Sequence, residues 1–309
     1  MDRNSQAKLT MKKVAIEIRH VQELFNGEFG PVIEFVKLAD EMGVDQVSIA
    51  DHVVVHGDAP SRYPGPEFPP FEHPWYEPVS ILSGLATVTK RIRLSMGVMI
   101  SPLRPAILLA KQLATLDVLS GGRLDAGFGA GWQHEEYDAE GLSFEGRFAR
   151  MEEQVYACRA LWSQWPASYS GNTVQFENLY SAPQPVKKNI PVWLGLRGVS
   201  DIAASRMARC ADGWIRTDSN PQKLGQDIAR LREVFVQHGR KADDLTVRAQ
   251  VTHVLNKDGS PDIPGTLARA PAYAAADADI LEFFPGRLCR KADELEPLLR
   301  EIVALKKAL

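Results

Sequence analysis

The chain has 309 residues, of which 45% are hydrophobic and 24% are charged, a composition typical of a globular protein with two domains or one large α/β barrel. The formal net charge of −3 gives no indication of a nucleic acid or an anionic membrane as partner. No apolar run approaches the roughly 20 residues of a transmembrane helix, and residues 1–11 form a polar start that we expect to be a disordered tail.

Eight short apolar runs predict β-strands. Their apolar side chains follow one another without strict alternation, a pattern typical of a parallel sheet that is buried on both faces. The runs are 14–18, 46–50, 92–98, 124–128, 191–196, 213–216, 246–254 and 279–284. Helical patterns lie between many of them, at 31–42, 105–119, 146–163, 221–235 and 291–307.

This alternation of strands and helices predicts an α/β fold, a (β/α)8 TIM barrel that occupies residues 12–309 as one domain. An open, doubly wound sheet is the alternative. The connection 256–276 is the least regular, because its Asp, Gly and Pro residues allow only a short helix.

Two insertions interrupt the barrel pattern, at about 52–78 and 166–190. The first holds seven prolines between 56 and 78, which excludes regular structure in this prediction. Because it follows the second strand, it belongs at the carboxyl face, where its aromatic residues either wall a pocket or pin a surface loop. The second insertion reads as a β-hairpin over 168–186.

The cysteines and histidines show no metal-binding pattern. Cys158, Cys210 and Cys289 are far apart, so we interpret them as core residues of a protein from a reducing, cytoplasmic compartment. No partner spacing suggests metal ligation by the remaining histidines, which include His20, His73, His134, His238 and His253. The motifs HExxH, CxxC and GxSxG are absent, so metallohydrolases and serine hydrolases have no support, and we predict no metal.

The glycine-rich segment 121-GGRLDAGFGAGW-132 raises the question of a nucleotide loop. A dinucleotide fingerprint starting at Gly127 or Gly129 requires glycine where Trp132 or His134 stands, and no GK[ST] is present. Two interpretations remain. The glycines either let a flat ligand approach the backbone at the barrel mouth, or fit a crowded barrel interior.

The segment 50-ADHVVVH-56 places Asp51 and His52 at the carboxyl end of the second strand, where TIM-barrel catalysts lie. A histidine there can hydrogen-bond or exchange protons with a substrate near neutral pH. The alternative is an aspartate that caps the next segment and a histidine that holds the loop.

Three ordered motifs lie within residues 91–153: P-x-R after the third strand, A-K-Q-x-A-T-L-D-x-L-S-G-G-R, and G-x-G-A-G-W-x-x-E-E-[FY]. With these motifs the segment resembles the bacterial luciferase-like flavin or deazaflavin superfamily, and more narrowly its F420-dependent oxidoreductases. The ADHVVV segment and 192-VWLG…ADGW-214 also fit, so the resemblance covers residues 12–216 well and the last third only loosely.

The resemblance implies a luciferase-like (β/α)8 barrel with a cofactor ring in its mouth. In that family a non-prolyl cis peptide supports the ring, and here we expect it within Gly97–Ile100, at Val98–Met99. The glycine run that packs beside the cofactor corresponds to Gly129, Ala130 and Gly131.

Further residues follow from the same resemblance. His52 matches a histidine near the reactive ring edge, and Asp51 is expected to orient it. Arg197 and Gly198 are the candidates for the cofactor phosphate, although many relatives have Gly-Gly there. Trp132 stands where sugar-phosphate dehydrogenases have a catalytic acid, so it argues against a sugar-phosphate substrate and could stack on the ring or close the pocket.

The function implied is hydride transfer between F420 and a small organic substrate. The alternative is an FMN-dependent monooxygenase that uses O₂, and a third reading is a cofactor-binding barrel without catalysis. The resemblance also implies a homodimer.

Overall fold

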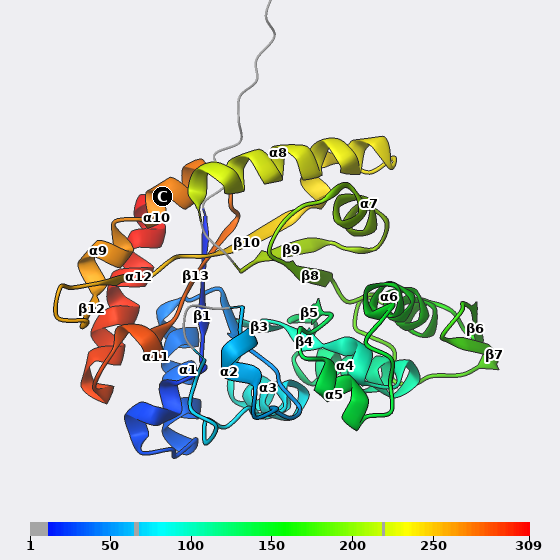
Figure 1. Ribbon diagram of the computed structural model, residues 1–309, viewed down its shortest axis with the longest axis horizontal. Helices are drawn as coiled ribbons and strands as arrows, with labels where there is room; N and C mark the ends of the chain where they lie inside the picture. The colour runs from blue at the N-terminus through cyan, green and yellow to red at the C-terminus, as the bar shows by residue number, and fades with distance from the viewer. Residues whose placement is uncertain (1–11, 65–67, 218–219) are drawn as a thin grey trace, which may run out of the picture.

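The computed structural model describes residues 12–64, 68–217 and 220–309, and its main sheet is a closed parallel barrel (Figure 1). Eight parallel strands form the ring in the order β1-β2-β3-β5-β8-β9-β10-β13, and β13 pairs with β1 to close it. The barrel strands are β1 (Lys13–Glu17), β2 (Gln46–Ile49), β3 (Arg93–Met96), β5 (Leu124–Gly129), β8 (Val192–Leu196), β9 (Gly213–Arg216), β10 (Thr246–Gln250) and β13 (Ile280–Phe283). The predicted (β/α)8 barrel is confirmed, and the open sheet is excluded because the ring closes. The predicted tail, residues 1–11, lies outside the described residues.

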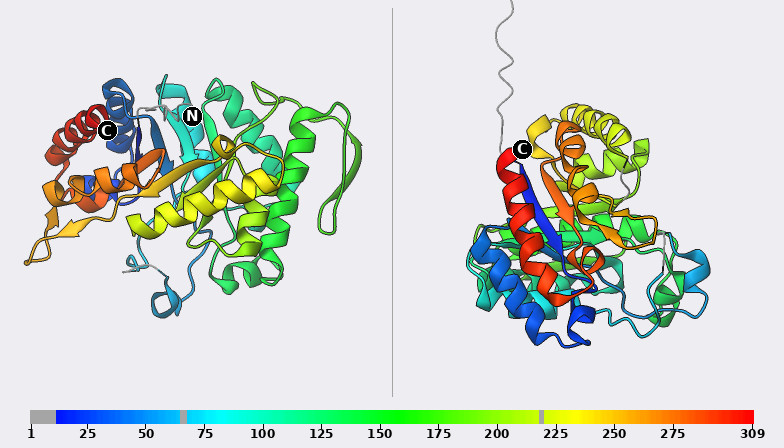
Figure 2. Two further views of the ribbon diagram at one scale, coloured as in Figure 1. Left: turned by 90° about the horizontal axis from the view of Figure 1, so that it is seen from above. Right: turned by 90° about the vertical axis from the view of Figure 1, so that its left-hand side faces the viewer.

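Helices surround the barrel, and α12 at the end of the chain packs beside α1 near its beginning (Figure 2). The helices of the outer ring are α1 (Gly30–Met42), α3 (Pro78–Val88), α4 (Ala106–Leu119), α6 (Arg147–Ser163), α7 (Asp201–Cys210), α8 (Pro221–Gln237), α10 (Ala270–Ala275) and α12 (Leu295–Ala308). Short helices and 3-10 turns are α2 (Ala59–Arg62), α5 (His134–Ala139), α9 (Ile263–Leu267), α11 (Pro285–Leu288), η1 (Val21–Phe25), η2 (Ser101–Leu103), η3 (Ala242–Asp244) and η4 (Ala292–Glu294). In the described part of the chain, no helix has both the length and the hydropathy needed to cross a membrane.

Helix α8 illustrates why these segments are helical. The Asn220 side chain accepts hydrogen bonds from the first free backbone amides, those of Gln222 and Lys223, and Pro221 occupies a first-turn position that needs no amide hydrogen. The residues buried against the barrel recur at helical spacing: Leu224, Ile228, Leu231 and Phe235.

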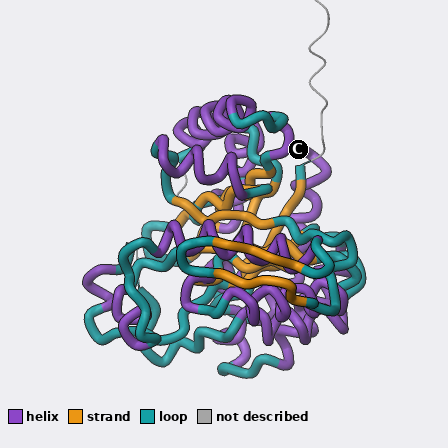
Figure 3. The backbone as a smooth tube through the Cα atoms, turned by 90° about the vertical axis from the view of Figure 1, so that its right-hand side faces the viewer, coloured by secondary structure: helices purple, strands orange, loops and turns teal. Residues whose placement is uncertain are grey.

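The irregular segments differ in part from the prediction. The proline-rich insertion contains α2, a single helical turn that the prediction excluded, because Pro60 stands at the start of the turn, where proline is tolerated. The hairpin in the second insertion is confirmed as β6 (Ala167–Ser170) and β7 (Gln175–Leu179), and it lies outside α6 (Figure 3). The connection after β10 holds two short strands, β11 (Val254–Leu255) and β12 (Pro261–Asp262), and two helices rather than one.

Hydrogen-bonded polar side chains fill part of the barrel interior. Arg248 donates to Gln46 over 2.6 Å, and Gln46 donates to Asp125 over 2.7 Å. Glu282 accepts from Ser48 at 2.6 Å and lies 3.3 Å from the Arg248 Nε. All five are almost completely buried, so each charge depends on its partners for stabilisation.

Candidate active site

A cavity of about 600 Å³ opens at the carboxyl ends of the barrel strands. Its lining includes residues at or just beyond the ends of all eight strands, which is where TIM-barrel enzymes place their active sites. The structure brings most of the predicted site residues to this lining: Asp51, His52, Val98, Gly129, Ala130, Gly131, Trp132 and Arg197.

Two predicted residues do not line the cavity. Met99 is fully buried in the hydrophobic core, because it lies between Val98 and Ile100 and its side chain takes the opposite side of the short strand β4 (Met99–Ile100). Gly198 is exposed and follows Arg197, the last lining residue of its loop. The Arg197 guanidinium, which we expected to bind the cofactor phosphate, donates a hydrogen bond to the carbonyl of Pro64 in the proline-rich insertion.

The Val98 side chain explains two glycines of the barrel mouth. The non-prolyl cis peptide is Gly97–Val98, one bond earlier than predicted but within the expected segment. A Cβ on Gly129 would lie 2.4 Å from Val98 Cγ2, and a Cβ on Gly195 would lie 2.4 Å from Val98 Cγ1. These glycines therefore make room for Val98, which in turn lines the cavity.

At Gly127 a different neighbour, the backbone of Met96, leaves no room for a side chain. A Cβ there would lie 2.0 Å from the Met96 carbonyl oxygen, so the adjacent strand requires glycine at this position. The glycine run thus fits the crowded barrel interior at Gly127 and supports the cavity wall at Gly129. Crowding therefore explains both glycines, and the close approach of a flat ligand to the backbone stays a prediction.

His52 is held by a carboxylate that the sequence interpretation did not single out. Its Nδ1 lies 3.1 Å from Glu136 Oε2, and the Gln133 amide lies 3.3 Å from the same oxygen. Glu136 Oε1 accepts the backbone amide of Val53 at 2.9 Å. Glu136 is 1% exposed, so the interaction is shielded from water. With Nδ1 donating to Glu136, Nε2 is the ring nitrogen left for a ligand.

Asp51 does not orient His52, in contrast to the prediction. Its carboxylate accepts two hydrogen bonds from Arg104, at 2.7 and 3.1 Å, and one from the backbone amide of Ile100 at 2.9 Å. Arg104 also contacts Glu77 at the start of α3. Burial lowers the pKa of Arg104, but attraction to these two carboxylates outweighs it and raises the pKa overall. Asp51 therefore ties the loop after β2 to β4 and positions the cavity wall.

Aromatic side chains of the proline-rich insertion form one wall of the cavity together with Trp132. The Tyr63 and Phe68 rings lie 5.6 and 6.5 Å from the Trp132 ring, and Trp75 packs edge-on against His52 at 4.6 Å. Of these, Tyr63, Trp75 and Trp132 line the cavity. The pocket-wall interpretation of this insertion is therefore the one that the structure supports.

The cavity lining carries more positive than negative charge. Three arginines are among its lining residues, Arg19, Arg197 and Arg287. Among the described lining residues, Asp51 is the one carboxylate, and Arg104 already pairs with it. Behind the lining, Arg19 Nε lies 3.5 Å from the carboxylate of the buried Glu17, whose pKa is raised by burial against the attraction of Arg19. Such a cavity favours a ligand that bears an anionic group.

The family model described as Luciferase-like monooxygenase matches residues 13–260, which span all barrel strands except β13. The chain belongs to the luciferase-like monooxygenase family. The uncharacterized protein Rv0953c of Mycobacterium tuberculosis is 32% identical over 231 residues, 75% of each chain. The F420-dependent glucose-6-phosphate dehydrogenase of Amycolatopsis mediterranei is 25% identical over 279 residues, 87% of this chain and 78% of that protein.

Solved structures of the same fold include enzymes of two kinds. An F420-dependent secondary alcohol dehydrogenase, in complex with an F420-acetone adduct, has a TM-score of 0.77 and 14% identity, covering 96% of this chain and 99% of the other. The monooxygenase RslO1 from Streptomyces bottropensis has a TM-score of 0.75 and 19% identity, covering 94% and 98%. At these identities, the likeness shows a shared fold.

Proposed function

We propose that this protein is an oxidoreductase that transfers a hydride between coenzyme F420 and a small organic substrate in the barrel mouth. The observation that carries the proposal is the cavity lined from all eight strands, with Val98 and His52 in its lining and the buried Glu136 hydrogen-bonded to His52. The F420-dependent dehydrogenases among the relatives and neighbours support the choice of cofactor.

The cavity residues fit such a cofactor. A volume of about 600 Å³ suits a large ligand with a flat ring, and Val98 and Trp132 offer apolar contacts for it. Gly131 lines the cavity with a φ of +66°, a backbone conformation that favours glycine, and a Cβ there would lie 3.0 Å from Ile100 Cγ2. Arg197 would meet an anionic group such as a phosphate, while Gly198 would contribute only from outside the lining.

The protein's own part in the reaction is position and proton management. Bound F420 would supply the hydride chemistry. His52 would donate a proton to, or accept one from, the substrate oxygen through Nε2. Glu136, hydrogen-bonded to Nδ1, would keep the ring in the orientation and tautomer that leave Nε2 for the substrate. This arrangement supplies a buried carboxylate four residues after Trp132, which itself offers no acid.

An FMN-dependent monooxygenase is the second candidate, favoured by the shared fold with RslO1. The two candidates are separated by mixing the protein with reduced F420 or reduced FMN and recording oxygen uptake. The proposal expects reduced F420 to be oxidised only when an organic acceptor is present, without oxygen uptake. Oxygen consumption that depends on FMN and on His52 would support the monooxygenase.

We also propose that two copies associate through α4. This helix is apolar on more than its buried side, because Ile107, Leu108, Val118 and Leu119 are 45–52% exposed. Exposed apolar side chains gathered on one element are typical of an interface.

The three cysteines are buried and free, which confirms their core position and supports a reducing compartment such as the cytoplasm.

A further inference from the structure

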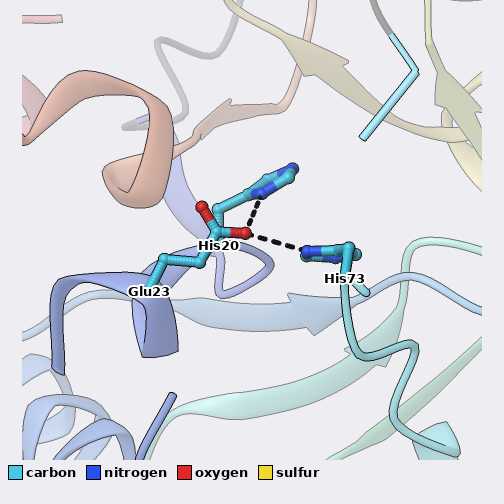
Figure 4. A group of neighbouring side chains, drawn as sticks. All are labelled: His20, Glu23 and His73. Atoms are coloured by element: carbon cyan, nitrogen blue, oxygen red, sulfur yellow. Dashed lines mark hydrogen bonds and ion pairs between the residues drawn. The ribbon is translucent and has the colours of Figure 1, made fainter. Parts of the chain in front are cut away.

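Two histidines and a glutamate meet beside the cavity, outside the proposed active site. His20 Nδ1 lies 2.8 Å from Glu23 Oε1, and His73 Nδ1 lies 2.9 Å from the same oxygen. Figure 4 shows the two rings directed at this carboxylate from separate segments, and His73 stands 50 residues further along the chain than Glu23. This separation explains why the spacing of the histidines gave no metal signal in the sequence.

The two rings are buried while the carboxylate reaches solvent. His20 is 9% and His73 is 7% exposed, whereas the Glu23 side chain is 50% exposed. The two rings are therefore shielded from water, whereas the carboxylate that joins them can be reached from solvent.

We propose that His20, Glu23 and His73 form a binding site for a divalent transition metal ion of the Zn²⁺ type. Neutral imidazole nitrogens with one carboxylate oxygen are a ligand set that Zn²⁺ and its first-row neighbours prefer. The ligand atoms of the three residues lie within 4.8 Å of one another. Water reaches the site along the exposed Glu23 side chain and completes a four-coordinate shell.

The geometry requires only a small adjustment to accept the ion. With metal–ligand bonds of about 2.0–2.1 Å, tetrahedral ligand atoms lie about 3.3 Å apart, compared with 2.8 and 2.9 Å between each Nδ1 and Oε1. The half-exposed Glu23 can supply this movement. In the hydrogen-bonded arrangement each ring donates from Nδ1 to Glu23, so binding an ion through Nδ1 moves the ring proton to Nε2, which has no hydrogen-bond partner among the described residues in either histidine.

The site would act on the cavity through the segment that carries His73. Trp75, two residues further on, lines the cavity and packs against the rings of His73 and His52, at 5.1 and 4.6 Å. A bound ion would fasten this aromatic wall to η1, directly after the first barrel strand. The role proposed for the ion is structural, since it holds a wall and contacts no substrate.

The competing explanation is that His20, Glu23 and His73 only hydrogen-bond to one another and bind no metal. The variant Glu23→Gln distinguishes metal binding from hydrogen bonding alone. The glutamine keeps a carbonyl oxygen that accepts from both rings, yet it lacks the anionic ligand that the ion requires. His134→Gln is the matched control, because His134 is an exposed histidine beside two carboxylates, 3.3 Å from Glu135 and 3.5 Å from Asp138.

The experiment treats the full chain with chelator and then titrates it with Co²⁺ and Zn²⁺ under reducing conditions. We expect one equivalent per chain, a visible Co²⁺ spectrum of low coordination number without thiolate bands, and a thermal midpoint that rises by about 5 °C at saturating Zn²⁺. Glu23→Gln should weaken binding at least tenfold, while His134→Gln should leave it unchanged.

Two results would overturn the proposal. One is a wild-type protein that shows no Co²⁺ spectrum, which needs no variant to be interpreted. The other is binding that Glu23→Gln leaves intact or that His134→Gln abolishes, since either would assign the ion to another site.

Discussion

The fit between Gly129 and Val98 gives a quantitative prediction about the cavity wall. A Cβ on Gly129 would lie 2.4 Å from Val98 Cγ2, more than 1 Å inside an ordinary carbon–carbon contact of about 3.5–4.0 Å. Gly129→Ala should therefore lower the free energy of unfolding by about 1–3 kcal/mol. Val98→Ala removes the clashing methyl and leaves Val98 Cβ at 3.3 Å, so the double variant should recover most of that loss.

The assay is chemical denaturation of the wild type, both single variants and the double variant. The double-mutant cycle should give a coupling energy of about 1–2 kcal/mol in the favourable direction. Gly127→Ala is the control, because its Cβ would meet the Met96 carbonyl oxygen and Val98→Ala cannot relieve that contact. Equal destabilisation by Gly129→Ala with Val98 present and absent would refute this account of the wall.

Four further predictions concern other parts of the chain. Glu136→Gln should lower kcat at least about tenfold, because it replaces the carboxylate that holds His52 Nδ1; an unchanged kcat would contradict this role. Gly84→Ala, inside α3 with nothing within 4 Å of its Cβ, should raise the free energy of unfolding by about 0.5–1 kcal/mol, and any loss would be contrary to expectation. Leu108→Glu should convert a dimer to a monomer in light scattering, whereas an unchanged mass would exclude α4 as the interface. The pKa of His20 is lowered from 6.5 to about 4, so the unfolded chain binds the proton first as the pH falls. Metal-free protein should therefore lose stability between pH 6.5 and 4, and not above, and a His20→Asn variant with the same pH dependence would speak against this.

The barrel could be predicted because each of its strands is a separate apolar run. Val192–Leu196 and Gly213–Arg216, for example, lie almost where the sequence places them. The strand predicted at 92–98 is interrupted in the structure. β3 ends at Met96, and the cis peptide Gly97–Val98 separates it from β4. Apolar character continues through that interruption, so no composition change marks it.

The partners of site residues were much harder to predict than the positions of those residues. Asp51 and His52 lie at the mouth as expected, but their adjacency in sequence wrongly suggested that they interact. The structure pairs Asp51 with Arg104 and His52 with Glu136, which lie 53 and 84 residues away along the chain. Such contacts depend on how successive loops pack across the barrel mouth, and no local pattern encodes that packing.

The relative affinity of the protein for F420 and FMN decides which cofactor the barrel mouth binds. An equilibrium titration of the protein with F420 and with FMN, in the same buffer, measures both dissociation constants. We expect one F420 per chain, bound at least tenfold more tightly than FMN. Tighter binding of FMN, or no binding of either cofactor, would contradict this expectation.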